Sequence, residues 1–196
     1  MNIIILNTQC ANLLSIKLSI EHLGYNAIIT NDPNIISTAD KLLLPGVGSA
    51  SEIMQQLYKN QLNEVIKKMT CPVLGICLGM QVLSSFSDES YGIDMLDIIS
   101  VPVLLLDSHD LPLPHTGWNQ VHFDKNNVLL KGIQTGSWFY YLHSYAYPIN
   151  KYTIATSCYN VHFSAIVQKN NFFGVQFHPE KSGAMGSKLL SNFLEI

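Results

Sequence analysis

The sequence predicts a single α/β domain over residues 1–196, with a three-layer mixed sheet that is parallel in its N-terminal half and antiparallel in its C-terminal strands. In the first half, short apolar runs alternate with segments of helical periodicity, which is typical of a parallel sheet flanked by helices. In the second half, strand-like runs follow one another with only turns between them, which favours antiparallel pairing. No repeat, low-complexity tract or linker divides the chain.

Strands and helices alternate along the first half. Leu13, Ile16 and Ile20 recur at helical spacing, and Gly24 ends that helix. Each strand candidate is an apolar run of four or five residues, as expected for strands buried on both faces. Further helices are predicted over 50–69, in two pieces, and over 78–86, and strands over 3–6, 27–30, 41–45 and 72–76.

The second half is richer in strand candidates. Aromatic and β-branched residues dominate these runs, and both kinds are enriched in strands. A final helix over 185–194 closes the chain. The predicted strands are 101–106, 118–123, 138–147, 152–159, 163–168 and 172–177.

The composition argues against several functional classes. The chain is 47% hydrophobic and 13% charged, with a net charge of −3 at pH 7, so no broad field favours nucleic acid or an anionic membrane. No apolar run reaches the roughly 18 residues of a membrane span, and the N-terminal run is too short for a signal peptide. The cysteines show no paired spacing, so we expect free thiols in a reducing cytoplasm; they are Cys10, Cys71, Cys77 and Cys158.

A thiol stands where a predicted strand turns into a helix, in the segment Gly-Ile-Cys-Leu-Gly at 75–79. This segment has the form of a nucleophile elbow with cysteine in place of serine, and its glycines permit the tight turn. The turn would place Cys77 at a helix N-terminus, where backbone amides stabilise a thiolate and can hold an oxyanion. A buried structural cysteine is the alternative interpretation of so short a motif.

An imidazole and a carboxylate stand two residues apart in Phe-Gly-Val-Gln-Phe-His-Pro-Glu, residues 173–180. Positions two apart in an extended segment point to the same side, so Glu180 can orient His178. This pair is the base and orienting acid of a Cys-His-acid triad. A histidine at a strand end beside a surface glutamate is the plainer alternative.

A glycine-rich turn follows another predicted strand, in Leu-Pro-Gly-Val-Gly at 44–48. Its backbone N–H groups can supply a second oxyanion donor, although a Pro-Gly pair alone indicates only a turn. Active groups of parallel sheets lie at the carboxyl ends of the strands, where all three segments are predicted. A nucleophile, a base with its orienting acid and an amide loop together form a complete acyl-transfer site.

The three segments occur together in the order and spacing of the class I (triad) glutamine amidotransferases, and this resemblance covers essentially the whole chain. It implies a flavodoxin-like fold, L-glutamine as substrate and a triad of Cys77, His178 and Glu180. It also implies an oxyanion hole formed by backbone amides and a cysteinyl thioester intermediate. The residues that it assigns to substrate binding are Gly46, Val47, Gly48, Leu78, Gln81, Ser144 and Tyr145.

Two further segments narrow the resemblance. Pro-His-Thr-Gly-Trp-Asn at 114–119 and the aromatic run at 138–146 are similar to those of the glutaminase subunits of imidazole glycerol phosphate synthase, which serves histidine biosynthesis. This similarity implies a heterodimer with a (β/α)₈ cyclase subunit that receives ammonia through a channel. No cofactor or metal is expected either, because the sequence has no G-x-G-x-x-G or Walker loop and its histidines show no ligand spacing; the charge and the short apolar runs favour neither nucleic acid nor membrane. The residues expected at the partner interface are Trp118, Asn119 and Tyr140.

The chain departs from the subfamily pattern at two places. Asn7-Thr8-Gln9 stands where Asp-x-Gly is usual, and Thr116 stands where methionine is usual. The first change falls in a loop expected near the substrate and partner side. Neither change touches the triad.

Other functions are compatible with the same triad. A stand-alone cysteine γ-glutamyl hydrolase or peptidase on this fold would work without a partner. A glutaminase subunit of anthranilate or guanylate synthesis would share the triad but differ at 114–119. A non-catalytic binding module is disfavoured because all three triad residues are present.

Overall fold

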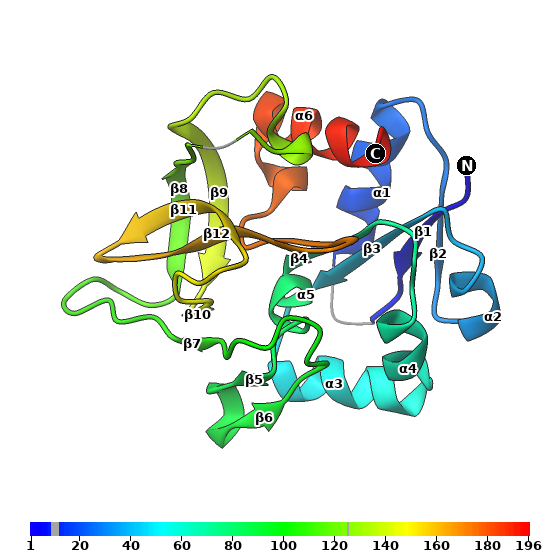
Figure 1. Cartoon of the computed structure of the whole chain (residues 1–196), viewed down its shortest axis with the longest axis horizontal. Helices are drawn as coiled ribbons and strands as arrows, with labels where there is room; N and C mark the ends of the chain where they lie inside the picture. Colours follow the sequence, from blue (N-terminus) through cyan, green and yellow to red (C-terminus); the bar gives the residue numbers. More distant parts are fainter. Residues whose placement is uncertain (9–11, 125) are drawn as a thin grey trace.

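The computed structural model describes residues 1–8, 12–124 and 126–196. A seven-stranded sheet in the order β11-β12-β13-β4-β3-β1-β2 forms its centre (Figure 1). The pairs from β2 to β13 are parallel, whereas β12 pairs antiparallel with both β13 and β11, as predicted. The strands are β1 (Ile3–Leu6), β2 (Ala27–Thr30), β3 (Lys41–Gly46), β4 (Val73–Cys77), β11 (Thr153–Tyr159), β12 (Val161–Lys169) and β13 (Phe172–Val175).

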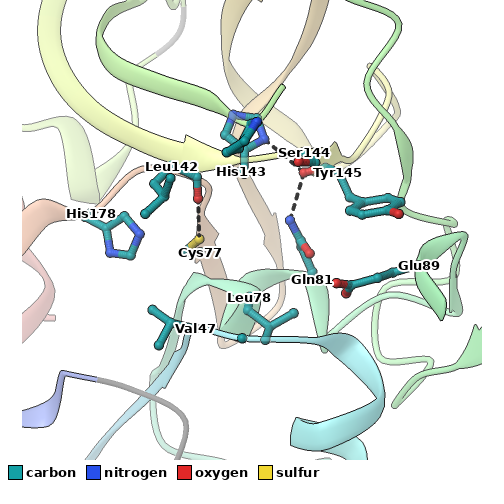
Figure 2. Close-up of a pocket in the computed structure, with 12 residues that line it drawn as sticks. Val47, Cys77, Leu78, Gln81, Glu89, Leu142, His143, Ser144, Tyr145 and His178 are labelled. Carbon is teal, nitrogen blue, oxygen red and sulfur yellow. Dashed lines mark hydrogen bonds between the residues drawn. The ribbon is translucent and has the colours of Figure 1, made fainter. Parts of the chain in front are cut away.

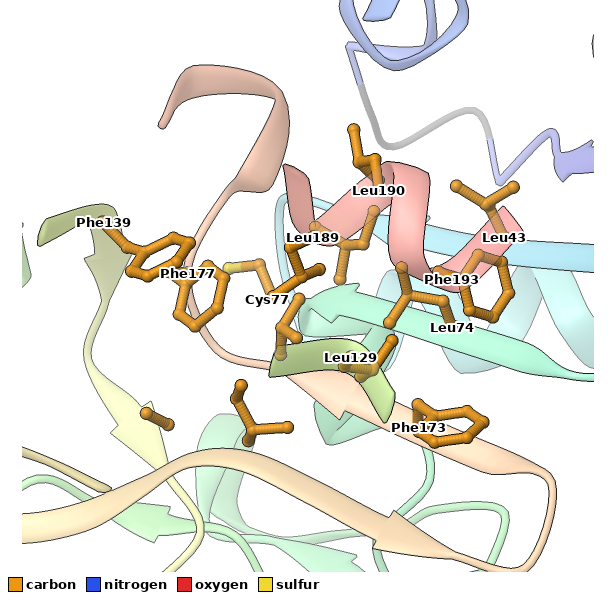
Figure 3. Close-up of a cluster of buried hydrophobic side chains, with 14 of the residues drawn as sticks. Leu43, Leu74, Cys77, Leu129, Phe139, Phe173, Phe177, Leu189, Leu190 and Phe193 are labelled. Atoms are coloured by element: carbon orange, nitrogen blue, oxygen red, sulfur yellow. The ribbon is translucent and has the colours of Figure 1, made fainter. Parts of the chain in front are cut away.

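Helices cover both faces of this sheet (Figure 1). Helices α1 (Leu13–His22) and α6 (Gly183–Leu194) lie on one face, and α3 (Ala50–Lys59) and α4 (Leu62–Lys67) lie on the other. Strand β1 shows why the apolar runs are continuous. Its odd residues Ile3 and Ile5 pack in the core of the α1 and α6 face, and the even ones pack in the opposite core. Figure 3 shows the first of these cores, in which Phe173 and Phe193 meet Leu74.

Two predicted helix boundaries follow from local chemistry. Gly24 follows α1 with φ +86°, so the predicted stop is confirmed. Helix α3 begins with a capping box, in which the Ser49 side chain accepts from the Glu52 amide and the Glu52 carboxylate accepts from the Ser49 amide. This cap fixes the chain directly after the 44–48 turn.

The predicted helix over 78–86 is too long. Helix α5 covers only Leu78–Gln81. The carbonyls of Val82, Leu83 and Ser84 accept hydrogen bonds from residues 96–99 instead of continuing a helix. The sequence also did not predict the short helix α2 (Pro33–Ile36), which Asp32 caps and Pro33 begins.

The aromatic strands of the second half form a separate hairpin rather than part of the main sheet. Among the described residues, strands β8 (His115–Val121) and β9 (Ser137–His143) pair with each other in register, and the bridge His122–Thr156 links this hairpin to β11. The predicted strand 138–147 breaks at Ser144 into β9 and β10 (Tyr145–Ala146), and 101–106 shrinks to β7 (Leu104–Leu105). The remaining small elements are β5 (Phe86–Ser87), β6 (Ile93–Asp94) and the 3-10 helices η1 (Glu89–Tyr91), η2 (Val128–Leu130) and η3 (Pro179–Lys181).

Helix α5 packs against strands β3 and β4 without any intervening side chain. A Cβ atom on Gly79 would lie 1.7 Å from the Leu44 carbonyl oxygen, and one on Gly75 would lie 2.5 Å from the Gly79 carbonyl oxygen. Both contacts are with backbone, which cannot yield as a flexible side chain would. The predicted need for glycine on both sides of Cys77 is therefore a packing requirement.

Replacement of Gly79 by alanine is expected to lower the free energy of unfolding by about 3 kcal/mol or more, because overpacking against backbone cannot be relieved locally. Urea denaturation measures the change. The control is Gly24→Ala, where φ is +86° but the space is open, so that only backbone strain of about 1–2 kcal/mol is expected. Equal losses in the two variants would contradict the packing argument.

Candidate active site

Cys77 ends β4 in a strained conformation, with φ 54° and ψ −114°. Few non-glycine residues adopt positive φ, and such strain concentrates at functional sites. The turn carries the buried thiol directly to the start of α5, as the elbow motif predicts. Its Sγ lies 3.5 Å from the Leu142 carbonyl oxygen and 3.8 Å from Gln176 Nε2.

His178 and Glu180 form the predicted pair. His178 Nδ1 lies 2.8 Å from Glu180 Oε1, and the two side chains are only 3% and 4% exposed. Because an ionised carboxylate only accepts, the Nδ1 atom carries the proton and Nε2 is the atom left for chemistry. Within the described part of the chain, Nε2 is buried and has no hydrogen-bond partner. Figure 2 shows the ring of His178 turned toward Cys77.

The expected extended segment over His178 and Glu180 is wrong, because Glu180 lies in the 3-10 helix η3. Strand β13 ends at Val175, and His178 lies three residues further on. Its position is set instead by the hairpin, because the His178 amide donates to the Tyr140 carbonyl at 2.8 Å. Ser182 strengthens this link, since its hydroxyl donates to the His178 carbonyl and accepts from the Tyr140 amide.

The pKa of His178 is raised to about 10. Burial by itself lowers the pKa, but interactions with Cys77 and Glu180 outweigh it, because both groups favour the charged ring. The imidazole is therefore held as a cation at neutral pH beside the thiol. This arrangement suits a thiolate–imidazolium pair.

A pocket of about 230 Å³ opens beside Cys77 and His178 (Figure 2). Six of the seven residues predicted for substrate binding line this pocket. They come from the 44–48 turn, helix α5 and the β9–β10 junction. Gly46 does not line the pocket, and a Cβ atom there would point into the packing, 2.9 Å from Ile53 Cδ1 and 3.0 Å from the Gly79 nitrogen. The six residues are Val47, Gly48, Leu78, Gln81, Ser144 and Tyr145.

Gln81 is fixed by two hydrogen bonds through its amide nitrogen. Its Nε2 donates to the Tyr145 carbonyl at 2.8 Å and to Gln176 Oε1 at 3.2 Å. Both N–H groups are thus used within the protein, so the group that Gln81 can offer to a ligand is its oxygen. Gln176 in turn reaches Cys77, which joins the nucleophile and the pocket wall in one network.

Glu89 is a pocket residue that sequence reasoning missed. It lies in η1, and its Oε2 accepts from the Ala50 amide at 2.7 Å, directly after the 44–48 turn. The pKa of the Glu89 carboxyl is raised, mainly because burial disfavours its charged form. The hydrogen bond from the Ala50 amide lowers the pKa in part, and the nearby charge of Glu52 raises it further. No local pattern marks this residue, because an isolated glutamate in a turn has the appearance of ordinary surface. Gln176 did carry a signal in the sequence, since it is a polar residue in an apolar run. The structure places its side chain fully buried.

The predicted interface residues lie on the β8–β9 hairpin. Trp118 is 52% exposed and packs edge-on against Tyr140, with ring centroids 6.1 Å apart. Asn119 points to the opposite face of β8, where its amide nitrogen reaches His115 Nε2. Tyr141, by contrast, is fully buried in the core.

The unusual N-terminal loop is described in part. Thr8 is buried, and its hydroxyl donates to the Pro45 carbonyl at 3.4 Å, so this loop does contact the 44–48 turn. Gln9 and Cys10 lie outside the described residues. The thiols of Cys71, Cys77 and Cys158 are free.

The following two statements apply to residues 1–8, 12–124 and 126–196 of the protein. No group of three or more His, Cys, Asp and Glu side chains is placed there to hold a metal ion. None of the helices there has the length and apolar character needed to cross a bilayer.

Known proteins resemble this chain in both sequence and fold. The family model for glutamine amidotransferase class-I matches residues 5–196. A candidate GMP synthase component from Thermoplasma acidophilum shares the fold, with a TM-score of 0.77 at 17% identity over 100% of this chain and 92% of its own. A solved glutamine amidotransferase gives a TM-score of 0.76 at 14% identity, covering 98% of this chain and 97% of its own.

Relatives found by sequence similarity point to a particular branch of this family. The imidazole glycerol phosphate synthase subunit HisH of Buchnera aphidicola (subspecies Acyrthosiphon pisum) is 54% identical over the full length of both chains. The subunit of the same name from Escherichia coli K12 is 53% identical, again over 100% of both. The chain therefore belongs to the class-I glutamine amidotransferases, in the branch formed by the HisH subunits of imidazole glycerol phosphate synthase.

Glu180→Gln is expected to lower the pKa of His178 from about 10 toward the ordinary value near 6.5, because the paired carboxylate charge is lost. A pH titration of the His178 ring by NMR measures this shift, with the exposed Glu64→Gln as a control that leaves it unchanged. Since the folded-state pKa is raised, the stabilisation is complete below about pH 6.5 and disappears as the pH rises through about 10. The wild type should therefore exceed Glu180→Gln in stability most clearly near pH 6, and an unaltered His178 pKa would contradict this account.

Proposed function

We propose that this chain is the glutaminase subunit of imidazole glycerol phosphate synthase in histidine biosynthesis. It hydrolyses L-glutamine to glutamate and ammonia through a cysteinyl thioester. It then delivers the ammonia to a cyclase partner that makes imidazole glycerol phosphate and an aminoimidazole carboxamide ribotide. The observation that carries the proposal is the assembly of Cys77, His178 and Glu180 at the mouth of a small pocket, in a chain 53–54% identical to HisH subunits.

Acylation begins from the thiolate–imidazolium pair. Cys77 Sγ bonds to the side-chain amide carbon of glutamine, and the carbonyl oxygen becomes an oxyanion. Gly48 and Leu78 line the same pocket as Cys77, which supports the assignment of their backbone amides as donors for that oxygen. The C–N bond then breaks as His178 Nε2 gives its proton to the departing nitrogen, which leaves as ammonia.

Deacylation uses the same residues in reverse roles. Neutral His178 takes a proton from water, whose oxygen bonds to the thioester carbon. The C–S bond breaks, glutamate departs, and the thiolate–imidazolium pair is restored. Glu180 keeps the ring in one orientation through both steps, because its hydrogen bond to Nδ1 leaves only Nε2 to exchange protons.

The far end of the pocket suits the amino-acid end of glutamine. Glu89 and Gln81 Oε1 offer acceptors to an α-ammonium group. The backbone at Ser144 and Tyr145 lines the same end and has amide donors suited to the α-carboxylate. Because these contacts lie opposite Cys77 in Figure 2, the side-chain amide of a bound glutamine would point to the thiol.

The outer face of the β8–β9 hairpin is the proposed surface for the (β/α)₈ cyclase. Trp118, Trp138 and Leu142 are exposed there, and aromatic residues of this kind dominate the energetics of protein interfaces. Leu142 also lines the catalytic pocket, so this surface adjoins the site of ammonia release. Ammonia carried from there through a dry path stays unprotonated and nucleophilic.

Cys77→Ala is expected to abolish synthesis from glutamine in the reconstituted two-subunit enzyme and to leave synthesis from ammonium salts intact, because only the nucleophile is lost. Imidazole glycerol phosphate formation from each nitrogen source measures both. A stand-alone hydrolase or peptidase would show no such split, and a glutaminase of anthranilate or guanylate synthesis would give no product with this cyclase.

Trp118→Ala is expected to weaken binding of the cyclase by about 2 kcal/mol or more, roughly 30-fold in Kd, as for a buried aromatic anchor. Titration calorimetry measures the change. Tyr58→Ala is the matched control, since Tyr58 is 54% exposed but lies on α3, away from the hairpin. Unchanged affinity for Trp118→Ala would remove the hairpin as the docking surface.

A further inference from the structure

A chain of hydrogen bonds leaves the pocket and runs through two buried histidines to strand β8. The Tyr145 carbonyl oxygen lies 2.9 Å from His143 Nδ1, and His143 Nε2 lies 3.0 Å from His115 Nδ1. His115 Nε2 lies 3.3 Å from Asn119 Nδ2. The catalytic steps above use neither histidine, yet both are buried, with 3% exposure for His115 and 5% for His143.

Both histidines are neutral at physiological pH. Burial lowers the pKa of His115 to about 4. Burial also lowers the pKa of His143 to about 3, assisted by repulsion from His115 and from the cationic His178. Each ring therefore carries a single N–H group, and the hydrogen bonds decide which nitrogen bears it.

The direction of the chain is fixed at both ends. The Tyr145 carbonyl can only accept, so His143 carries its proton on Nδ1 and accepts at Nε2 from His115 Nδ1. His115 Nε2 must then accept from the Asn119 amide. The orientation of Asn119 is set independently, because its Nδ2 donates to the Cys158 carbonyl and its Oδ1 accepts from the Gln120 amide, each at 2.8 Å.

Aromatic packing holds the first ring of the chain in place. His115 is stacked between Tyr141 and Tyr159, at centroid distances of 5.0 Å and 4.1 Å and an angle of 24° to each. Tyr141 is itself tied by its hydroxyl to Ser157 at 2.6 Å. The imidazole therefore cannot turn its nitrogens away from the chain without disrupting the core.

We propose that His115 and His143 are positioning residues of this site. The two neutral rings form a relay, that is, a chain of hydrogen bonds with a single donor-to-acceptor direction from Asn119 to the Tyr145 carbonyl. This relay fixes the carbonyl and with it the Ser144–Tyr145 wall of the substrate pocket. The reverse direction would place the Nδ1 lone pair of His143 against the carbonyl oxygen. Only one of the two directions therefore holds the wall, and Gln81 meets the same carbonyl from the other side (Figure 2). The identity of the substrate as glutamine rests on the proposed function.

The first test reads the tautomers directly. Long-range ¹H–¹⁵N correlation spectra of the ¹⁵N-histidine-labelled wild-type chain at pH 7, without substrate, are expected to show both rings protonated on Nδ1 and unprotonated on Nε2. A ring protonated on Nε2, or present as imidazolium, would overturn the relay. Because no substrate is added, this result does not depend on the glutaminase assignment.

The second test uses kinetics with a conservative pair of variants. His143→Leu removes the donor to Tyr145 and is expected to raise the KM for glutamine roughly three- to tenfold, with a much smaller change in kcat. His143→Asn can place an N–H near the position of Nδ1 but no longer accepts from His115, so its KM is expected to lie between those of the wild type and His143→Leu. His115→Phe preserves the aromatic stack but breaks both hydrogen bonds, and should raise KM as His143→Leu does.

These measurements use the chain in complex with its cyclase partner and nucleotide ligand, with thermal unfolding as the check on folding. Equal KM values for wild type, His115→Phe and His143→Leu would overturn the relay, as would a wild-type KM for His143→Asn, because a local donor would then suffice without His115. A wild-type complex that releases no glutamate would instead overturn the proposed function, while the tautomers still decide the relay.

Discussion

The close approach of helix α5 to strands β3 and β4 is the constraint on which the site depends. Because Gly75 and Gly79 carry no side chains, the chain can turn within one residue, and Cys77 takes up the strain with φ 54°. The turn at Cys77 places the thiol at the edge of the sheet where strand β3 ends and the 44–48 turn lies. The same glycines bring Leu78 beside that thiol, so the proposed nucleophile and the proposed oxyanion donor depend on one packing contact.

Three histidines in one buried region serve in two charge states. Glu180 and the thiol hold His178 as a cation, whereas burial keeps His143 and His115 neutral. The positive charge of His178 also disfavours protonation of His143, so the charged state of one ring helps to keep the other neutral. Neighbouring groups whose pKa values are pushed apart are typical of sites that move protons. In the proposed mechanism His178 transfers the proton, whereas His143 donates to the Tyr145 carbonyl of the pocket wall and His115 donates to His143.

Local sequence patterns predict the parallel half of the sheet well, because each strand is a short apolar run followed by polar or turn-forming residues or by a helix start. The strands over 3–6 and 27–30 are confirmed to the residue. The β8–β9 hairpin was placed in the wrong sheet, since its alternation of buried and exposed residues satisfies either pairing. The triad residues lie together as their motifs indicated, but Glu89 and the His115–His143 pair depend on contacts between distant segments, and no local pattern encodes those.

The pocket that contains Cys77 adjoins the hairpin surface proposed for the cyclase, and we propose that binding of this partner controls glutamine hydrolysis. The most direct measurement is the rate of glutamate release from glutamine by the chain alone, and then with the cyclase and its nucleotide ligand. A partner-controlled glutaminase predicts little release alone and a large increase in the complex. Rapid release by the isolated chain, unchanged by the partner, would contradict this claim and indicate an independent hydrolase built on the same triad.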